Sequence, residues 1–522
     1  MPSMPSKPSE SSKPSKPAKS SMSAYAPLKD RVVLRRDILA SLVVFLVALP
    51  LCVGVAVASG VPAELGLVTG IVGGLLVGCL PGSSLQVSGP AAGLTVLVYE
   101  AVKEFGLGTL GAIVLVSGLL QLALGALGFG RWFRAISVAV VQGMLAGIGL
   151  VLILGQLYAM ADTAQPSGGL GKLGGLLELA VAVITDGSAL TPFLIGAGTI
   201  AVLVLWPRFP ARVRVVPGPL AAVALATGVV LLLDLSVAKV EVQGLLESVR
   251  PPGLDDFGRL GTVAAIGTVL AFTLIASAES LFSAAAVDRM HDGPRTDYNK
   301  ELMAQGVGNT VCGALGALPM TAVIVRSSAN VRAGARTPLS RVLHGLWLLL
   351  FAALLPAAIG VIPLAALAGI LVHAGCKLVP VRELAPLWRE HRGEAVILVV
   401  TALAILVTNL FEGVVLGLLL AVVKTAWEIS HLHVDVRELT GGRMVVTITG
   451  NATFLRLPRT MEQLEELPKD RPIELDLSGL RHVDHACRVA LENWALRHND
   501  RGTEPVTMRP PMVGNGQKSN GG

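Results

Sequence analysis

Two stretches of this chain begin as extended, glycine- and proline-rich backbone and continue as helix: PGSSLQVSGPAAGLTVLVYEAV at residues 81–102 and GALGALPMTAVIVRSSANVRAG at residues 313–334. Inside a bilayer, irregular backbone must line a cavity or be buried in protein, because no water is there to satisfy its amide and carbonyl groups. A pair of interrupted segments in the two halves of a membrane chain is therefore a good sequence indication of a binding site near the midplane.

The remainder of the chain is apolar enough to place both stretches in a membrane. Of the 522 residues, 52% are hydrophobic and 15% are charged, and the mean hydropathy is +0.67. The apolar runs are mostly about 17 to 25 residues long, the length of helix that crosses a ~30 Å hydrocarbon layer. We mark fourteen segments, several of them short: 38–58, 64–80, 87–102, 108–127, 134–158, 176–206 with a bend, 217–234, 261–287, 299–318, 323–334, 339–359, 361–376, 394–410 and 412–430.

The order of these segments predicts the fold. The two interrupted stretches are the third and the tenth segment, seven apart, as an inverted seven-plus-seven repeat would place them. We therefore expect an all-α polytopic transport domain at residues 28–430, embedded in the lipid bilayer. In the second segment Gly66, Gly70, Gly74 and Gly78 recur at every fourth position, a stripe that we interpret as a helix-packing surface.

Basic residues set the expected topology. Counted from a cytoplasmic amino end, the loops on the cytoplasmic side carry these basic residues: Arg131, Arg134, Arg208, Arg212, Arg214, Arg289, Arg295, Arg332, Arg336, Arg341, Lys377, Arg382 and Arg389. The positive-inside rule then predicts a multi-pass protein of the cell inner membrane with both termini in the cytoplasm. These loops also explain the net charge of +6, so we expect no nucleic-acid partner.

The ends of the chain differ from this membrane part. Residues 1–27 are mostly Ser, Pro and Lys, and we expect them, like residues 508–522, to be disordered tails. From residue 431 the hydrophobic period becomes two in VDVREL, MVVTIT and PIELDLSGL, whereas LPRTMEQLEELP and VDHACRVALENWALRHN read as helices. A small cytoplasmic α/β domain is therefore expected at residues 431–507.

The interrupted stretches can bring two helix amino ends together. If the helices begin near Gly89-Pro90 and Val325-Arg326, each offers unpaired N–H groups and roughly half a positive charge to a shared cavity. Such a site can hold a small anion without a full cation, which allows both binding and release. Arg326 is costly enough inside a membrane to indicate function, and the alternative is a cytoplasm-facing arginine like Arg332.

Glu279 is the second charged residue within an apolar segment. It could carry a coupling proton, or form part of a cation site with Ser283, which lies one turn later on the same helix face. The alternative is a fixed structural contact, either an ion pair with Arg326 or a bond to a backbone partner. The five cysteines lack metal-ligand spacing, and the chain contains no Walker A loop, GxSxG elbow or HExxH motif, so we expect no metal site, cofactor or enzyme activity.

The chain resembles the SulP family of sulfate and bicarbonate transporters. The similar motifs are ALPLCVGVAVASGVPAELGLVTGIVGG, QVSGPAAGLTVLV, AESLFSAAAVDRM and GNTVCGALGALPMTAVIVRSSANVRAGARTPLS, and IELDLSGLRHVDHACRVALENWA resembles a STAS domain. The resemblance implies fourteen spans in an inverted repeat, a core module that moves against a gate module, a homodimer, and a small inorganic anion as substrate. It places the following residues by position: Ser88, Gly89, Pro90 and Ala91 on the third-helix side of the anion site, Val325, Arg326 and Ser327 on the tenth-helix side, and Glu279 with Ser283 in the acidic motif.

This chain departs from the family pattern at several positions. Many members have Pro-Gln where it has Pro50-Leu51-Cys52, which removes a possible polar contact, and many have a hydroxyl residue where it has Val325. Sodium-coupled bicarbonate members tend to have Asp at the Glu279 position and no arginine at the Arg326 position. Both residues together therefore favour proton coupling or exchange.

The STAS-like domain departs as well. Asp484-His485-Ala486-Cys487 stands where related soluble regulators place a phosphorylatable Ser, and the domain is expected to be shortened by its last strand and helix. We expect an assembly or regulatory role for it, without phosphorylation at that position.

The sequence therefore predicts a secondary active transporter of a small inorganic anion, with sulfate or bicarbonate as substrate, coupled to protons or working by exchange, and moving like an elevator. A sodium-coupled bicarbonate symporter is the alternative within transport. The alternative from another class is a membrane-anchored regulator that does not transport and binds a cytoplasmic partner through its STAS-like domain.

Overall fold

The computed structural model describes residues 31–131, 137–166, 168–210, 212–242, 244–439, 442–501 and 504–510. The tail expected at residues 1–27 lies outside these residues, as does most of the tail expected at 508–522. The chain divides into two compact units, one built from residues 1–136, 145–379 and 405–411 and the other from residues 137–144, 380–404 and 412–522.

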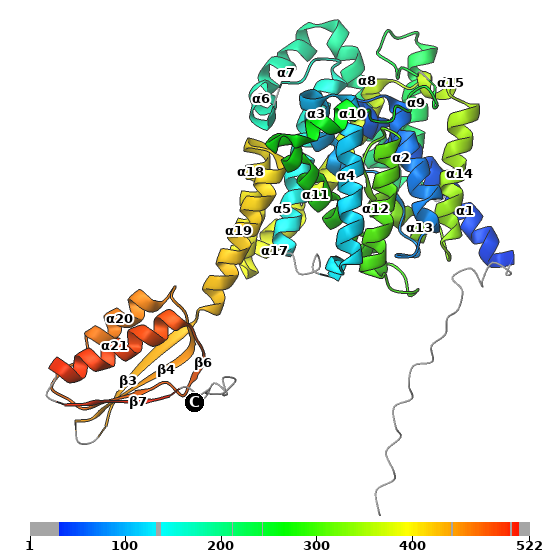
Figure 1. The fold of residues 1–522 in the computed structure, drawn as a ribbon. Coiled ribbons are helices and arrows are strands. Elements are labelled where there is room, and N and C mark those ends of the chain that lie inside the picture. The colour runs from blue at the N-terminus through cyan, green and yellow to red at the C-terminus, as the bar shows by residue number, and fades with distance from the viewer. Residues whose placement is uncertain are drawn as a thin grey trace, which may run out of the picture. The chain divides into compact units, whose positions relative to one another are not determined.

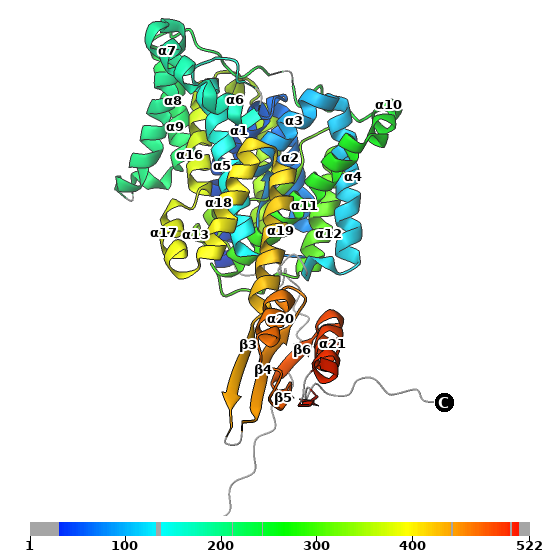
Figure 2. The ribbon, with the colours of Figure 1, turned by 90° about the vertical axis from the view of Figure 1, so that its left-hand side faces the viewer.

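Helices make up most of the described residues between 31 and 430 (Figures 1 and 2). The α-helices are α1 (Arg31–Ala58), α2 (Ala63–Leu75), α3 (Thr95–Phe105), α4 (Leu107–Ala126), α5 (Val138–Met160), α6 (Gly168–Gly174), α7 (Leu176–Thr185), α8 (Gly187–Leu205), α9 (Gly218–Leu232), α10 (Leu254–Gly258), α11 (Val263–Asp288), α12 (Tyr298–Ala314), α13 (Ile324–Arg332), α14 (Leu339–Leu354), α15 (Ala357–Gly360), α16 (Leu364–Leu378), α17 (Val381–Glu390), α18 (Arg392–Val407) and α19 (Leu410–Ile429). Short 3₁₀ helices are η2 (Val77–Cys79), η3 (Ala92–Leu94), η5 (Trp206–Arg208), η6 (Val213–Val215) and η7 (Arg259–Gly261), and two short strands are β1 (Ser88–Pro90) and β2 (Met320–Ala322).

Each of the fourteen predicted segments overlaps at least one of these helices. Among the described residues, seven helices are long and apolar enough to cross a membrane, or up to eight if the pair α6–α7, bent by 45°, forms one span. Three shorter apolar helices cover residues 63–79, 218–232 and 339–354. The chain is thus a mostly helical membrane protein, and the count of fourteen spans stays a prediction, because short helices such as α3 and α13 do not reach the length of a full span.

The glycine stripe of α2 packs as predicted. A Cβ added at Gly74 would lie 2.5 Å from the Cα of Gly345 on α14, and one at Gly66 would lie 2.1 Å from the carbonyl oxygen of Cys52 on α1. No side chain fits at these distances, so α1, α2 and α14 contact one another backbone to backbone. The two interrupted stretches are thereby anchored beside a tightly packed group of three helices.

The small domain is an α/β unit, as its period-two pattern predicts. Its strands are β3 (Leu432–Glu438), β4 (Met444–Ala452), β5 (Ile473–Asp476), β6 (Leu480–Val483) and β7 (Val506–Arg509), and its helices are α20 (Leu457–Glu465) and α21 (His485–Arg501). The strands pair in the order β3-β4-β5-β7, β6 pairs with β4, and only β3–β4 is antiparallel. Both helices cover one face of this sheet (Figure 1), where Leu464 and Trp494 pack on Ile448 and Leu475.

The expectation that the last strand of this domain is missing is wrong. β7 pairs in parallel with β5 in the register Ile473↔Val506 to Asp476↔Arg509, so the domain extends beyond residue 507. Only Val506 of the four β7 residues is buried, and so short a segment shows little hydrophobic alternation in the sequence. The expected loss of a following helix falls outside the described residues.

Asp484 belongs to the segment that stands where related soluble regulators place a phosphorylatable Ser, and it has a structural role. Asp484 accepts hydrogen bonds from the backbone N–H groups of Cys487 (2.7 Å) and Phe454 (2.5 Å), so it caps the amino end of α21. Burial, and then the neighbouring Asp484 carboxylate, raises the pKa of the Cys487 thiol to about 12. Near neutral pH this cysteine is therefore a protonated core residue rather than a nucleophile.

The contact between Gly74 and Gly345 yields a prediction on stability. Gly74→Val should lower the free energy of unfolding by about 1–3 kcal/mol or more, because the added side chain must push α2 and α14 apart. Thermal unfolding of the purified protein in detergent would measure this loss. Gly228→Val on α9 is the matched control, since a Cβ at Gly228 meets no heavy atom within 4 Å among the described residues. Equal melting temperatures for the two variants would contradict the proposed backbone contact.

Candidate functional site

The two interrupted stretches meet. β1 and β2 pair antiparallel in the register Ser88↔Ala322, Gly89↔Thr321 and Pro90↔Met320. η3 and α3 follow β1 closely, and α13 follows β2, so two helices begin next to this strand pair. An antiparallel pair is the arrangement that a two-fold axis in the membrane plane produces, which supports an inverted relation between the two stretches.

Buried polar side chains hold the strand pair in place. Asn309 on α12 accepts a hydrogen bond from the N–H of Met320 (2.7 Å) and donates one to its carbonyl (3.1 Å), as a third strand would. On α11, the hydroxyl of Ser280 accepts from the N–H of Ala322 (3.2 Å) and that of Ser283 donates to its carbonyl (2.9 Å). Ser280 and Ser283 thus position β2.

The first turn of α13 is open to solvent. The Ser327 N–H donates the first intrahelical bond, to Val323 O (2.9 Å), so the N–H groups of Ile324, Val325 and Arg326 precede this ladder. The Val325 side chain is 45% exposed, whereas Arg326 and Ser327 are fully buried. A ligand that approaches α13 would therefore meet backbone amides and an apolar side chain.

Ser327 ties the two stretches together. Its hydroxyl accepts a hydrogen bond from the N–H of Val87 (2.9 Å) and donates one to Val323 O (2.8 Å). On the opposite stretch, the Ser88 hydroxyl accepts from the side-chain amide of Gln305 (2.7 Å). The Ser327 hydroxyl thus both accepts and donates within the protein, so its contribution to the site is to shape it.

Arg326 lies inside the protein, directly behind β1. It is 0% exposed, and Nη2 donates a hydrogen bond to Pro90 O (3.2 Å). A Cβ at Gly89 would lie 2.1 Å from Nη1, so only glycine leaves room for the guanidinium. Nε and Nη1 have no hydrogen-bond partner among the described residues. The alternative of a cytoplasm-facing arginine is therefore wrong, since Arg332, later on the same helix, is exposed and Arg326 is not.

Cys52 is part of the surroundings of Arg326. Its thiol is buried and lies beside the guanidinium. The thiol is thus a weakly polar group next to the buried charge, one position after Leu51, which stands where many members have Gln.

Glu279 lies beside the beginning of the third helix. A Cβ at Gly93 would lie 2.8 Å from its Oε1 and 2.9 Å from its Oε2, and the Thr321 side chain lies within hydrogen-bonding reach of the carboxyl. Oε2 has no hydrogen-bond partner, and no ion pair links Glu279 to Arg326, within the part of the chain that the structure describes. The alternative of a fixed ion pair between the two is therefore not realised.

A thin apolar layer covers the amino end of α3. Val55, Leu152 and Leu371 are buried against one another, and Ala92 packs on them. They come from α1, α5 and α16, so three other helices pack against the turn that leads into α3.

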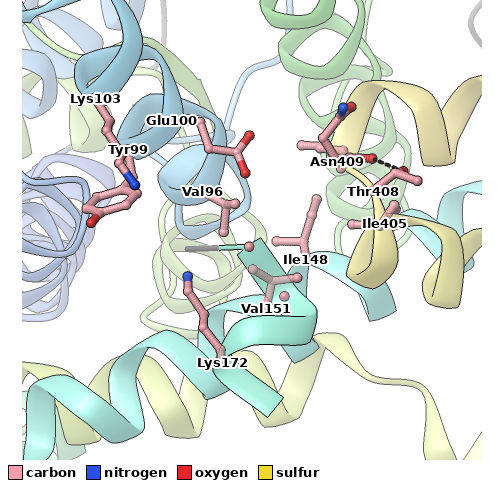
Figure 3. A pocket seen from close by; sticks show the side chains of 13 residues that line it. Val96, Tyr99, Glu100, Lys103, Ile148, Val151, Lys172, Ile405, Thr408 and Asn409 are labelled. Atoms are coloured by element: carbon pink, nitrogen blue, oxygen red, sulfur yellow. Dashed lines mark hydrogen bonds between the residues drawn. The ribbon is translucent and has the colours of Figure 1, made fainter. Parts of the chain in front are cut away.

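Three neighbouring cavities all reach Tyr99 on α3. One of about 90 Å³ is lined by Glu100, Lys103 and Lys172 (Figure 3), and one of about 360 Å³ by Gln156 and residues 162–165. A narrow space of about 10 Å³ shares lining residues with both. Lys172 was not among the residues expected at the site, because GGLGKLGG lies between the segments expected at 134–158 and 176–206; a lone lysine in such a run is the signal that could have identified it.

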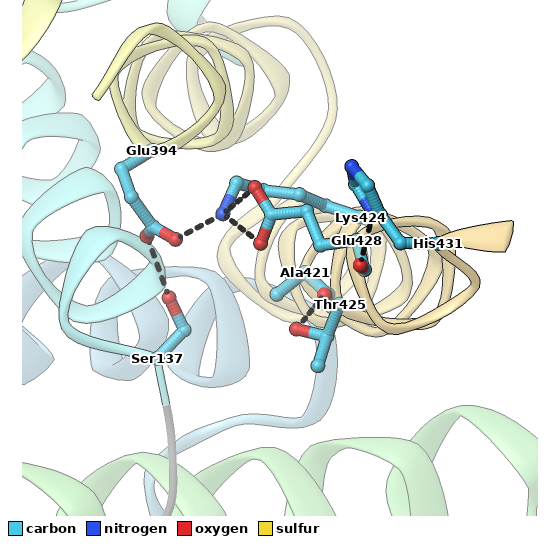
Figure 4. Close-up of polar contacts among 7 residues, drawn as sticks. All are labelled: Ser137, Glu394, Ala421, Lys424, Thr425, Glu428 and His431. Carbon is cyan, nitrogen blue, oxygen red and sulfur yellow. Dashed lines mark hydrogen bonds and ion pairs between the residues drawn. The ribbon is translucent and has the colours of Figure 1, made fainter. Parts of the chain in front are cut away.

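The second unit contains a charged cluster of a different kind (Figure 4). Lys424 on α19 lies 2.8 Å from Glu394 on α18 and 2.9 Å from Glu428, and Ser137 lies 3.3 Å from Glu394. Each charge has a partner of opposite sign, so this cluster joins helices. Arg326 and Glu279 differ from it in having unpaired atoms.

The hydrogen bonds of Ser327 yield a prediction on stability that tests its structural role. Ser327→Ala should lower the free energy of unfolding by about 1–3 kcal/mol, because the buried N–H of Val87 loses its acceptor. Ser328→Ala is the control, since the neighbouring hydroxyl bonds only to Val325 O, at the surface (3.0 Å). Differential scanning fluorimetry of both variants would measure the difference, and a Ser327→Ala protein as stable as the control would contradict this role.

The comparisons with known proteins agree with this geometry. Residues 34–401 match the sulfate permease family. The bicarbonate transporter BicA of Picosynechococcus sp. is 27% identical over 487 residues, which cover 89% of this chain and 81% of BicA. The solved transmembrane domain of a cyanobacterium BicA has a TM-score of 0.63 at 24% identity, covering 74% of this chain and 97% of that domain.

A further solved structure extends the similarity in fold. Murine Slc26a9, an anion transporter solved in the inward-facing state, has a TM-score of 0.77 at 15% identity and covers 93% of this chain, with 87% of its own chain matched. Since the family match spans well over half of its residues, this chain belongs to the sulfate permease family of membrane transporters, which are not enzymes.

Proposed function

We propose that the protein is a secondary active transporter of a small inorganic anion, sulfate or bicarbonate, which binds at the amino ends of α3 and α13. The observation that carries this proposal is the β1–β2 pair, after which two helices, η3 continued by α3 and α13, begin at one place. Two helix amino ends and a buried guanidinium give this place a positive potential. The family description names sulfate, and the relative BicA is named a bicarbonate transporter.

Arg326 supplies charge from behind the site. Its burial beneath Gly89 keeps it from contacting an anion directly, while the low-dielectric surroundings let its field reach the first turn of α13. An anion held by amides and a distant charge can leave again, as transport requires. Val325 fits this arrangement, because its side chain neither donates nor accepts hydrogen bonds.

Glu279 is the group we propose for coupling. Its unpartnered oxygen lies beside Gly93, at the beginning of the third helix, so a proton on the carboxyl would change the charge next to the anion. Proton coupling or exchange is therefore the proposed mode.

Access would alternate through movement of one module against another. α1, α2 and α14 contact backbone to backbone and would move with the strand pair as one core. The layer of Val55, Leu152 and Leu371 that covers Ala92 would part in this movement. We propose an elevator-like motion of this core within a homodimer.

Uptake by proteoliposomes tests the proposal as a whole. Labelled sulfate, bicarbonate and chloride would be offered under proton and sodium gradients. Accumulation of sulfate or bicarbonate driven by protons, or by exchange, would support it. A strict sodium requirement would favour sodium–bicarbonate symport, and the absence of any uptake would favour a membrane-anchored regulator.

Arg326→Ala should lower the apparent affinity for the anion by about tenfold or more, since a full charge near a bound anion is worth at least about 1.4 kcal/mol in a low-dielectric site. Concentration-dependent uptake would measure this effect. Arg332→Ala on the same helix is the control, because that arginine is exposed. Unchanged affinity in Arg326→Ala would show that the buried charge does not act on the substrate.

Glu279→Gln should remove the dependence of uptake on external pH, because an amide cannot carry the proton. The measurement is the initial uptake rate across a pH series at constant anion concentration. Glu104→Gln, an exposed carboxylate near the end of α3, is the control and should keep the wild-type profile. A Glu279→Gln protein with the wild-type pH profile would rule out this carboxyl as the proton carrier.

A further inference from the structure

Lys172 is a nearly buried cation that the proposed transport site does not use. It lies on α6 and is 6% exposed, and its side chain extends toward α3 across the cavity (Figure 3). Its ammonium lies 5.8 Å from the centroid of the Tyr99 ring. No ion pair within 4.0 Å is formed by this ammonium among the residues that the structure describes, although Glu100 lines the same cavity. A charge kept in a membrane segment without a partner needs a reason.

The narrow space beside Lys172 is lined by further polar groups. Thr95, Gln156 and Gln165 line it together with Lys172. Thr95 is 2% exposed, and its hydroxyl has no hydrogen-bond partner within the described ranges. Such a buried hydroxyl costs free energy unless a ligand or water satisfies it.

The glycine at position 155 keeps this space open. A Cβ there would lie 2.7 Å from Gln165 Oε1 and 3.3 Å from Lys172 Nζ. The narrow space of about 10 Å³ has room for about one water. The adjoining cavities of about 90 and 360 Å³ are large enough for a small hydrated anion.

The location of these groups relates them to the transported anion. Thr95 is the first residue of α3, the helix whose amino end forms the proposed site. Leu152 and Ala58 line the narrow space and also belong to the apolar layer that covers Ala92. The narrow space therefore reaches the beginning of α3 at Thr95, beside the apolar cluster on which Ala92 packs.

We propose that the cavities around Lys172 form an outer binding position for the transported anion, with Lys172 as its cation and Thr95 and Gln156 as hydrogen-bond donors. The anion waits there until the layer of Val55, Leu152 and Leu371 parts, and then moves about one helical turn along α3. Glu100 opposes the anion and limits how tightly it is held, which favours onward transfer. This inference rests on the proposed transport function.

The test is the concentration dependence of sulfate and bicarbonate uptake in proteoliposomes. Lys172→Gln should raise KM by roughly three- to tenfold and weaken its dependence on ionic strength, because a charge near the entry path is lost. Glu100→Gln should lower KM, and Lys172→Arg should stay near the wild type. Lys300→Gln is the control, since Lys300 is exposed and pairs with Asp297.

The outcomes separate the two proposals. If the wild-type chain transports and KM is unchanged in both Lys172→Gln and Glu100→Gln, the outer position is overturned and the transport function stands. If the wild-type chain takes up neither anion, both are overturned. If Lys172→Gln fails to fold, the KM of Glu100→Gln decides alone. A purely structural role of Glu100 would not give this variant a higher affinity for the anion than the wild type has.

Discussion

The hydrogen-bonded pair of β1 and β2 is the constraint on which the rest of the membrane domain depends. Extended backbone inside a bilayer exposes N–H and C=O groups that lipid cannot satisfy, so the two stretches must satisfy each other and borrow side chains for the remainder. Asn309 closes one edge of the pair, and Ser280 and Ser283 hold Ala322. The helices that begin at this junction therefore have fixed starting points, and their free amides are oriented before any ligand arrives.

The tight helix contacts and the buried charge follow from that junction. Arg326 can lie behind β1 only because position 89 carries no side chain, and α2 can approach α14 only because Gly74 faces Gly345. Both features remove bulk near the strand pair. The core is thus built from small residues where backbones meet, and from polar side chains where backbone groups would otherwise be unpaired.

Much of this could be read from the sequence, because glycine and proline mark where a helix must break. The third and tenth segments, the stripe of α2 and the alternating strands β3 and β4 are all local patterns. The polar side chains that hold the strand pair in place were not predictable, because Asn309 and Ser280 contact residues that only the fold brings near them. Lys172 was missed because α6 has only seven residues, and β7 because it has only four, too few for a periodicity to stand out. The thiol of Cys52 beside Arg326 likewise depends on how α1 packs, which one sequence does not reveal.

The layer of Val55, Leu152 and Leu371 has an electrical consequence. In the proposed transport, an anion that leaves the cavities around Tyr99 would pass this apolar cluster, which is the least polarisable part of the proposed route. A voltage across the membrane drops mainly where polarisability is lowest, and each elementary charge gains about 2.3 kcal/mol per 100 mV. Most of the membrane voltage would then act over this short distance, and the step that carries net charge past Leu152 would be the one whose rate follows the membrane potential.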